Sequence, residues 1–472
     1  MVFSSIIFIL FFFPLFLIVY NLVGKRLKNF TFLFFSIVFY AWGAPDFVFY
    51  LLGSTLINFY LVRQMYFAII RKTRRILAFT SIFINLGLLA YFKYANFFIE
   101  NLNFTLRQIG AEPAHWVDVA LPIGISFFTF QSLTYTIDVY RRIHPPLKNP
   151  LDYILYIIMF PQLIAGPIVR FETIADQLTN RKETNDERLT GFYRFVIGLS
   201  KKVLIADVLG LEVNNIMALD LSTIDATTAW TGILAYSFQI YFDFSGYSDM
   251  AIGMGRMLGF KFPENFDNPY TASSITEFWR RWHMTFTTFM RYYLYYPLGG
   301  NRVSSKFRLY FNLGFVFLIS GLWHGASWNF VIWGLIHGFF LIIERVFLSK
   351  WLKKGGKVTG VAYTFLVVVL AWVPFRIETL PDSMTYFSQL FSFDFSPLVQ
   401  SKLQVYVMIV IALVISLITL SGFGLMLQAK IYKLKLSNKE QLYYFAVAMI
   451  FLILVIATLA GSGFSPFIYF RF

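Results

Sequence analysis

Residues Leu309–Ile343 contain no Asp, Glu, Lys or Arg, and this uncharged stretch constrains the fold more than any other feature of the sequence. A helix needs roughly 17 to 25 mostly apolar residues to cross the hydrocarbon core of a bilayer, so the stretch is long enough to enter a membrane. Uncharged runs of this kind recur from one end of the chain to the other and leave no room for a soluble domain of ordinary size. We therefore predict an all-α polytopic membrane protein with one integral domain over residues 1–472.

The composition agrees with a membrane protein and excludes the soluble classes. Of 472 residues, 58% are hydrophobic, 20% are aromatic and only 14% are charged, which no soluble globular class matches. The formal net charge of +15 would suggest nucleic-acid binding in a soluble protein. Here the lysines and arginines gather in short loops beside apolar segments, so we expect no nucleic-acid partner. The absence of cysteine excludes disulfides, cysteine metal sites and thiol catalysis.

The basic loops define a predicted topology. Such clusters are typical of cytoplasmic loops, and they also attract anionic lipid headgroups or a phosphorylated cosubstrate. Counting from an outer N-terminus gives about twelve crossings plus re-entrant or interfacial helices, with both termini outside. The clearest predicted crossings are Met1–Gly24, Asn29–Ala44, Phe47–Val62, Ile76 to about Phe98, Leu121–Tyr140, Ala226 to about Tyr241, Val358–Phe375, Leu403 to about Met426 and Leu442 to about Ala460.

Three segments in the middle of the chain do not look like simple crossings. The apolar run Tyr153–Val169 is broken by Pro161 and by a Gly-Pro pair, so we expect it to enter the membrane and turn back. Gly191–Met217 carries charges and is typical of a tilted or interfacial helix. Thr276–His283 mixes aromatic residues with arginine and predicts an interfacial or re-entrant helix. If that helix is continuous, Trp279 and His283 share one face.

His324 lies inside the uncharged stretch and is the leading candidate for chemistry. Ionisable side chains in spanning segments usually mark a functional site, and histidine exchanges a proton near neutral pH. The following Gly325 predicts the end of a helix, and Ser327 is a candidate N-cap for the next one. The alternative is an imidazole that only bonds a backbone carbonyl at a helix junction. His337 would lie roughly 20 Å away on an ideal helix, so we expect it to have a packing role.

Other polar residues near the apolar segments allow a functional or a structural interpretation. His283 is either a partly solvated interfacial side chain or a group that binds the acceptor. Arg280 and Arg281 fit headgroup anchors as well as ligands of cosubstrate phosphates. Asp243 and Asp249 follow a predicted crossing, and we interpret them as groups that line a cavity or cap a loop rather than as a catalytic acid pair.

Several mechanisms have no motif in this sequence. There is no Gly-x-Ser-x-Gly elbow, no phosphate loop and no dinucleotide glycine turn. The five histidines show no zinc spacing, so we expect neither a metal nor a bound cofactor. A covalent serine mechanism is disfavoured.

Several longer motifs, in order along nearly the whole chain, resemble the membrane-bound O-acyltransferase family. Within that family the resemblance is to the bacterial polysaccharide-modifying branch, which includes the membrane subunit that O-acetylates alginate. The motifs are Met1–Ser5, Leu121–Phe127, Phe160–Gln162 with Gly166–Pro167, Tyr241–Asp249, Phe278–His283, Gly321–Gly325 and Phe467–Phe470.

The resemblance implies an enzyme of the bacterial inner membrane. It matches His324 to the family's catalytic histidine and His283 to its second polar residue. It also implies a passage for the acyl donor from the cytoplasm and a path for the acceptor from outside. The donor would be acetyl-CoA and the acceptor an extracytoplasmic polysaccharide, reached directly or through a periplasmic acyltransferase partner. We assign to the passage Trp323, Asn329, Trp279, Arg280, Arg281, Asp243 and Glu277.

Two other functions stay open at this point. Within the family, the alternative is D-alanyl transfer to teichoic acid. In a different class, a sugar or lipid transporter would use the same buried polar groups only for binding. An enzyme should lose turnover on His324→Ala, whereas a transporter should move intact substrate without consuming a thioester.

Overall fold

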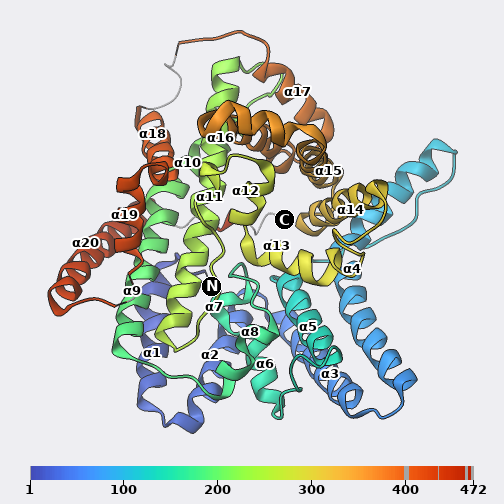
Figure 1. The fold of residues 1–472 in the computed structure, drawn as a ribbon, viewed down its shortest axis with the longest axis vertical. Helices are drawn as coiled ribbons and strands as arrows, with labels where there is room; N and C mark the ends of the chain where they lie inside the picture. Colours follow the sequence, from blue (N-terminus) through green and yellow to red (C-terminus); the bar gives the residue numbers. More distant parts are fainter. Residues whose placement is uncertain (1, 398–402, 434, 463–465, 469–472) are drawn as a thin grey trace. The chain divides into compact units, whose positions relative to one another are not determined.

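Every regular element that the structure describes is a helix, which confirms the predicted all-α class. The structure is a computed structural model that describes residues 2–397, 403–433, 435–462 and 466–468 (Figure 1). Three residues of the family-like motifs, Met1, Tyr469 and Phe470, lie outside these ranges.

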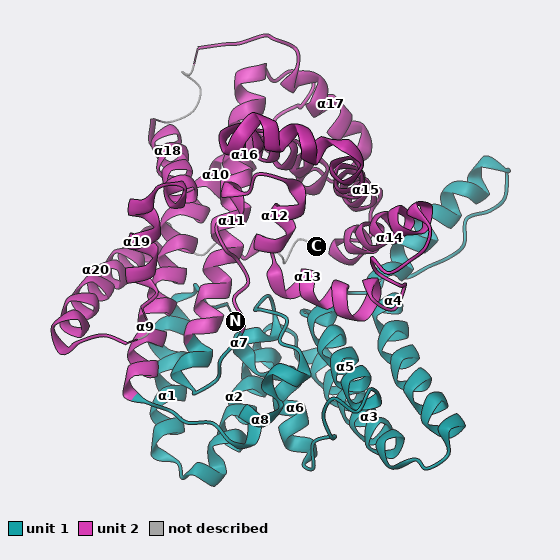
Figure 2. Ribbon diagram, in the orientation of Figure 1, with its two compact units in different colours: residues 1–184, 254–262 teal, residues 185–253, 263–472 magenta. Residues whose placement is uncertain are grey.

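The chain divides into two compact units (Figure 2). The first unit comprises residues 1–184 and 254–262, and the second comprises residues 185–253 and 263–472. The single integral domain that we expect over residues 1–472 stays a prediction. Two compact units can belong to one membrane domain, so this division does not test it.

The first unit is built around buried aromatic side chains. Phe160 is fully buried, and its ring centroid lies 5.2 Å from that of Phe16 and 5.4 Å from that of Phe32. The predicted break near Pro161 is present, because one helix ends at Ile158 and the next begins at Phe160. The α-helices are α1 (Phe13–Leu22), α2 (Lys28–Gly43), α3 (Val48–Phe67), α4 (Arg71–Gln108), α5 (Ile125–Tyr140), α6 (Pro150–Ile158), α7 (Phe160–Leu163) and α8 (Phe171–Thr179).

The second unit contains all the predicted catalytic residues. Its α-helices are α9 (Asn185–Ser200), α10 (Asp207–Met217), α11 (Ala226–Met257, of which the part up to Gly253 belongs here), α12 (Ile275–Arg281), α13 (Met284–Met290), α14 (Lys306–His324), α15 (Trp328–Ile343), α16 (Ser349–Arg376), α17 (Leu380–Leu390), α18 (Leu403–Leu417), α19 (Gly422–Ile431) and α20 (Asn438–Ser462).

Short helical segments extend several of these helices. The π-helical segments are η1 (Phe8–Phe12), η4 (Lys201–Ala206), η6 (Arg291–Tyr295) and η7 (Glu344–Leu348). The 3₁₀ segments are η2 (Lys25–Leu27), η3 (Pro45–Phe47), η5 (Pro269–Thr271) and η8 (Ile418–Leu420).

Helices α14 and α15 pack side by side because glycines face each other where they meet. A Cβ atom added to Gly321 would lie 2.2 Å from the carbonyl oxygen of Phe330, and one added to Gly334 would lie 2.3 Å from that of Phe317. Small residues let helix backbones approach closely where larger side chains would hold them apart. This close approach fixes the end of α14, and therefore His324, against α15.

Five described helices are long and apolar enough to cross a membrane. They are Pro45–Phe67, Arg71–Gln108, Trp328–Arg376, Leu403–Leu420 and Asn438–Gly461. The predicted count of about twelve crossings is not confirmed by these criteria and stays a prediction, as does the orientation of the termini.

Two local predictions are wrong. Helix α11 does not end near Tyr241 but continues to Met257, so Asp243 and Asp249 lie within a helix and cap no loop, while the alternative that they line a cavity stays a prediction. Trp279 and His283 do not share one helical face, because α12 ends at Arg281 and His283 has left-handed backbone angles (φ 43°, ψ 52°). His283 instead directly precedes the first residue of α13.

Candidate active site

His324 is the last residue of α14, and Gly325 ends the helix as predicted. Ser327 occupies the N-cap position of α15, although its side chain makes no capping hydrogen bond. The His324 imidazole is 3% exposed and surrounded by aromatic rings from four helices. The ring centroids lie 4.8 Å from Trp323, 4.9 Å from Trp333, 5.2 Å from Phe375 and 5.5 Å from Phe286.

His283 is fully buried at the junction of α12 and α13. Its ring centroid is 4.7 Å from that of Phe244 and 5.0 Å from that of Phe286. Its Nδ1 atom lies 3.1 Å from Oδ1 of Asn265. No described residue makes a hydrogen bond with its Nε2 atom.

The structure brings the two predicted catalytic histidines to the same pair of aromatic rings. Phe286 contacts His283 and His324 with centroid distances of 5.0 and 5.5 Å. Trp323 does the same at 6.0 and 4.8 Å. Two buried imidazoles therefore contact one aromatic wall, formed by Phe286 and Trp323.

Trp279 forms a hydrogen bond with His337 rather than with His283. Its Nε1 donates to Nδ1 of His337 at 3.2 Å, and both side chains are buried. The distance expected between His337 and His324 on one ideal helix does not apply, because the ring of Trp333 contacts both, with centroids 4.9 Å from His324 and 5.0 Å from His337. The chain folds back between α14 and α15, which brings the two histidines closer than a continuous helix would.

Glu277 and Arg281 form a pair on α12, with Arg281 donating to Glu277 at 2.6 Å. Burial raises the pKa of the Glu277 carboxyl, but hydrogen bonds from the amide and hydroxyl of Ser273 and the nearby guanidinium outweigh burial and hold it below its ordinary value. Arg280, by contrast, is exposed. Of the charged residues of α12 that we assigned to the passage, Glu277 and Arg281 therefore bond each other, and Arg280 is an exposed cation.

Asn329 holds the start of α15 in place. Its side-chain amide donates to the carbonyl of Ile377 at 2.5 Å and to the hydroxyl of Ser383 at 3.1 Å. The side chain is buried. These contacts tie the start of α15 to residues 377 and 383, which is a structural role. The role of Asn329 in a passage stays a prediction.

Asp243 is buried and paired. It lies 2.8 Å from Nζ of Lys202, and its Oδ2 accepts a hydrogen bond of 2.7 Å from the backbone amide of Ile468. Lys202 also bonds Asp207 at 2.6 Å. The ring of Phe467 packs on Tyr247 with a centroid distance of 4.6 Å. Asp243 therefore attaches a short C-terminal segment to α11.

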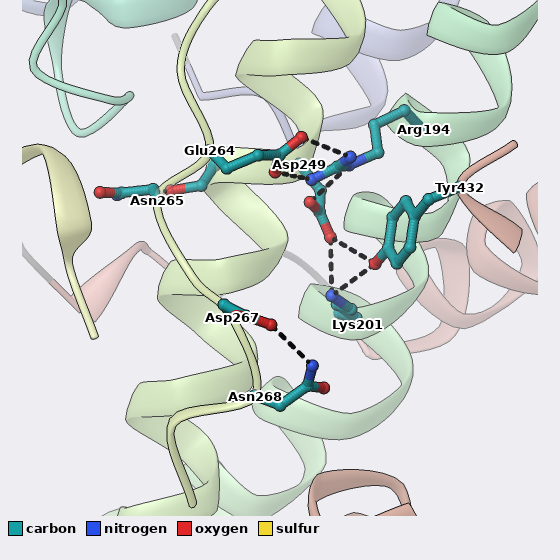
Figure 3. Close-up of polar contacts among 9 residues, drawn as sticks. Arg194, Lys201, Asp249, Glu264, Asn265, Asp267, Asn268 and Tyr432 are labelled. Atoms are coloured by element: carbon teal, nitrogen blue, oxygen red, sulfur yellow. Dashed lines mark hydrogen bonds and ion pairs between the residues drawn. The ribbon is translucent and has the colours of Figure 1, made fainter. Parts of the chain in front are cut away.

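A second group of charged side chains surrounds the buried Asp249, and it comprises the buried Arg194, the half-buried Lys201 and the exposed Glu264 (Figure 3). Arg194 donates to Asp249 at 2.6 Å and to both carboxylate oxygens of Glu264 at 3.1 and 2.5 Å. Lys201 donates to Asp249 at 2.6 Å and to the hydroxyl of Tyr432 at 3.3 Å. Buried charges are tolerated when they are paired and hydrogen-bonded in this way.

Sequence reasoning missed three residues that support the site: Arg194, Asn265 and Glu344. Glu344 is buried on the segment after α15 and accepts from the amides of Ile275 and Thr276, so it caps the start of α12. Arg194 and Glu344 carry charges inside apolar segments, which is a signal for a functional or paired group. Asn265 lies in a polar linker and had no comparable signal.

Comparisons with known proteins identify the class of enzyme to which this site belongs. Residues 144–373 match the model of the membrane-bound O-acyltransferase family. The chain belongs to this family, because relatives that align over 90% or more of it share more than 40% identity with it, and it is an acyltransferase.

The relatives come from several bacteria. A probable alginate O-acetylase AlgI of Pseudomonas putida is 42% identical, with 100% of both chains covered. The peptidoglycan O-acetyltransferase of Helicobacter pylori is 36% identical over 81% of this chain and 78% of its own. The teichoic acid D-alanyltransferase of Bacillus subtilis is 30% identical over 49% of this chain and 60% of its own. The enzyme interpretation is thus confirmed.

Proposed function

We propose that this protein transfers an acetyl group from cytoplasmic acetyl-CoA towards the hydroxyls of an extracytoplasmic polysaccharide, with His324 as the general base. The observation that carries the proposal is the pair of buried histidines on one aromatic wall, in a chain whose relatives, aligned over more than three quarters of both chains, bear the names of polysaccharide O-acetyltransferases.

The chemistry needs one base and a site that excludes water. His324 accepts the proton of the acceptor hydroxyl while its oxygen attacks the thioester carbonyl. The tetrahedral intermediate then breaks its carbon–sulfur bond, so that an acetyl ester forms and the thiolate of CoA leaves. The imidazolium returns the proton to that thiolate. The rings around His324 exclude water, which would otherwise hydrolyse the thioester.

His283 is the second catalytic group in this proposal. It is buried against the same Phe286 ring, with Nε2 as the ring atom not engaged by Asn265. There it orients the acceptor hydroxyl or the thioester carbonyl. We further propose that Arg280, the exposed cation of α12, binds phosphate groups of the donor.

The cellular setting is also part of the proposal. The protein would lie in the bacterial inner membrane with both termini outside, take its donor from the cytoplasm and deliver acetyl groups outside. Delivery would be direct or through a periplasmic acyltransferase partner.

Release of free CoA from acetyl-CoA tests the proposal. The protein would be purified in lipid nanodiscs and measured with and without O-deacetylated alginate or peptidoglycan fragments. We expect acceptor-dependent CoA release in the wild type and none in His324→Ala. His115→Ala is the matched control, because His115 is exposed on a loop, and it should keep full activity. Equal release by wild type and His324→Ala would overturn the role of His324.

D-alanyl transfer is the second candidate, favoured by the similarity to teichoic acid D-alanyltransferases over about half of the chain. That reaction would consume a D-alanyl thioester instead of acetyl-CoA. Supplying both donors in parallel separates the two, since only the correct thioester should disappear in an acceptor-dependent way.

A further inference from the structure

Asn265 is the only polar side chain that the structure describes in hydrogen-bond contact with His283. It is itself 1% exposed. Its Oδ1 atom receives the backbone amide of Thr285 at 3.3 Å and the hydroxyl of Thr285 at 2.8 Å. Its Nδ2 atom donates to the hydroxyl of Ser248 at 2.9 Å. Because a backbone amide can only donate, these contacts fix which end of the Asn265 side chain is oxygen.

The orientation of Asn265 determines the protonation of His283. The Nδ1 atom of His283 faces Oδ1 of Asn265 at 3.1 Å, and an acceptor oxygen requires a proton on the nitrogen that it meets. The remaining contacts of His283 that the structure describes are with aromatic rings and include no carboxylate. A fully buried imidazolium would therefore lack a counter-charge, which favours the neutral ring. In a neutral ring with hydrogen on Nδ1, the lone pair is on Nε2.

The backbone around Asn265 is fixed against the His283 junction. The amide of Met284 donates to the carbonyl of Asn265 at 2.9 Å, and the amide of Asp267 donates to the carbonyl of Arg281 at 2.9 Å. The two segments thus pair on both sides of His283. Glu264, the residue before Asn265, is bound by both terminal nitrogens of Arg194 (Figure 3).

A group of charged side chains continues from Glu264 into the helices. Arg194 is simultaneously bound to Asp249, and its guanidinium lies over the ring of Tyr432, with a distance of 4.3 Å to the ring centroid. Asp249 is also bound by Lys201. Glu264 itself is exposed, but Arg194 and Asp249 are buried, so the linker that carries Asn265 is attached through Glu264 to a buried ion pair of α9 and α11, whereas polar linkers are usually mobile.

We propose that Asn265 is a positioning residue that holds His283 as the neutral ring with hydrogen on Nδ1 and so presents Nε2 as the atom that meets the reacting groups. This inference rests on the proposed catalytic role of His283 for its functional meaning, but the ring state can be measured without any turnover. Partners that orient a catalytic histidine fix its tautomer and its ring plane in the same way in other enzymes.

Nitrogen-15 NMR of the imidazole rings tests the proposal directly. The chain has five histidines, so ¹⁵N-histidine labelling gives few signals, and His283→Gln identifies the signals of His283 by their loss. In the wild type in nanodiscs we expect a protonated Nδ1 and an unprotonated Nε2 at neutral pH. A wild-type spectrum with the proton on Nε2 of His283 would overturn the proposal even if no Asn265 variant folds.

Variants at Asn265 give the second part of the test. Asn265→Ala should produce a mixture of the two tautomers and lower kcat by about 100-fold or more, with little change in the KM for the donor. Asn265→Asp keeps an acceptor for Nδ1 and should keep the proton there. The matched control is Asn312→Ala, since Asn312 is also fully buried and bonds only backbone carbonyls of residues 298 and 300 among its described contacts. It should leave the His283 signals unchanged.

The outcomes separate this inference from the proposed function. Absence of acetyl-CoA turnover in the wild type would count against the proposed function, while the NMR signals of the same sample still decide the role of Asn265. An unchanged tautomer in Asn265→Ala, or an equal change in Asn312→Ala, would contradict the positioning role.

Discussion

The ring of Phe286 contacts two buried imidazoles, with its centroid 5.0 Å from that of His283 and 5.5 Å from that of His324. These histidines come from the start of α13 and the end of α14. Phe286, like Trp323, is therefore a described side chain that links the two proposed catalytic groups.

Replacing this ring tests whether the spacing matters. Phe286→Leu keeps an apolar side chain but removes the flat surface that contacts both imidazoles. We expect a 10- to 100-fold loss in the rate of acceptor-dependent CoA release, on the order of 1.4 to 2.7 kcal/mol in the barrier. Phe289→Leu is the control, because Phe289 is also buried on α13 and its ring packs on that of Tyr293, with a centroid distance of 4.9 Å. Equal effects of the two substitutions would contradict a special role for Phe286.

The contact of α14 with α15 gives a second prediction. Gly334→Val places branched carbons against the carbonyl of Phe317 and the backbone of Gly321, so the helices must separate and His324 must move. We expect a lower melting temperature and loss of activity. Gly314→Ala is the matched control on the same interface, because its nearest neighbour would be a side-chain atom at 3.9 Å. Normal activity in Gly334→Val would show that close helix packing is not needed to place His324.

Arg280 gives a test of donor binding. If its exposed guanidinium binds donor phosphates, Arg280→Ala should raise the KM for acetyl-CoA about 10-fold and leave kcat nearly unchanged, because the contact is made equally in ground and transition states. Steady-state kinetics at several donor concentrations measures this. Arg308→Ala, which removes another exposed arginine, should change neither constant. A fall in kcat alone would point to a role for Arg280 outside donor binding.

Local signals made parts of the site predictable. His324 could be placed at a helix junction because Gly325 directly follows an uncharged helical run, and the structure confirms that α14 ends there. The break near Pro161 has the same kind of local cause.

Features set by distant residues could not be predicted. Helix α11 continues past Asp243 and Asp249 because their charges are compensated by Lys202, Arg194 and Lys201, which lie far away in the sequence. His283 likewise has left-handed backbone angles at a junction whose two sides bond the linker around Asn265. The sequence pattern of residues 276–283 alone does not indicate that this segment is hydrogen-bonded to the linker around Asn265.

The pair of Trp279 and His337 gives a prediction about stability. Trp279→Phe keeps an aromatic ring but leaves Nδ1 of His337 without its donor. A buried polar atom that loses its partner costs about 1 to 3 kcal/mol, so the melting temperature should fall. CoA release per folded molecule should change little if His337 has the packing role expected from the sequence. A strong loss of turnover at unchanged stability would instead assign His337 to the chemistry.

The charges around Asp249 should contribute more to stability than any exposed ion pair. Asp249→Asn leaves Arg194 and Lys201 short of a buried negative charge, and breaking a buried pair from one side costs about 3 to 5 kcal/mol. Glu440→Gln removes the exposed pair with Lys433, where both side chains are more than one third exposed, and should change the melting temperature little because solvent screens such pairs. Thermal unfolding in detergent compares the two variants.

Because Arg194 also binds Glu264, Asp249→Asn should loosen the linker that carries Asn265 and reduce activity even in the molecules that stay folded. Similar melting temperatures for both variants would mean that solvent or lipid headgroups reach the Asp249 cluster and screen its charges.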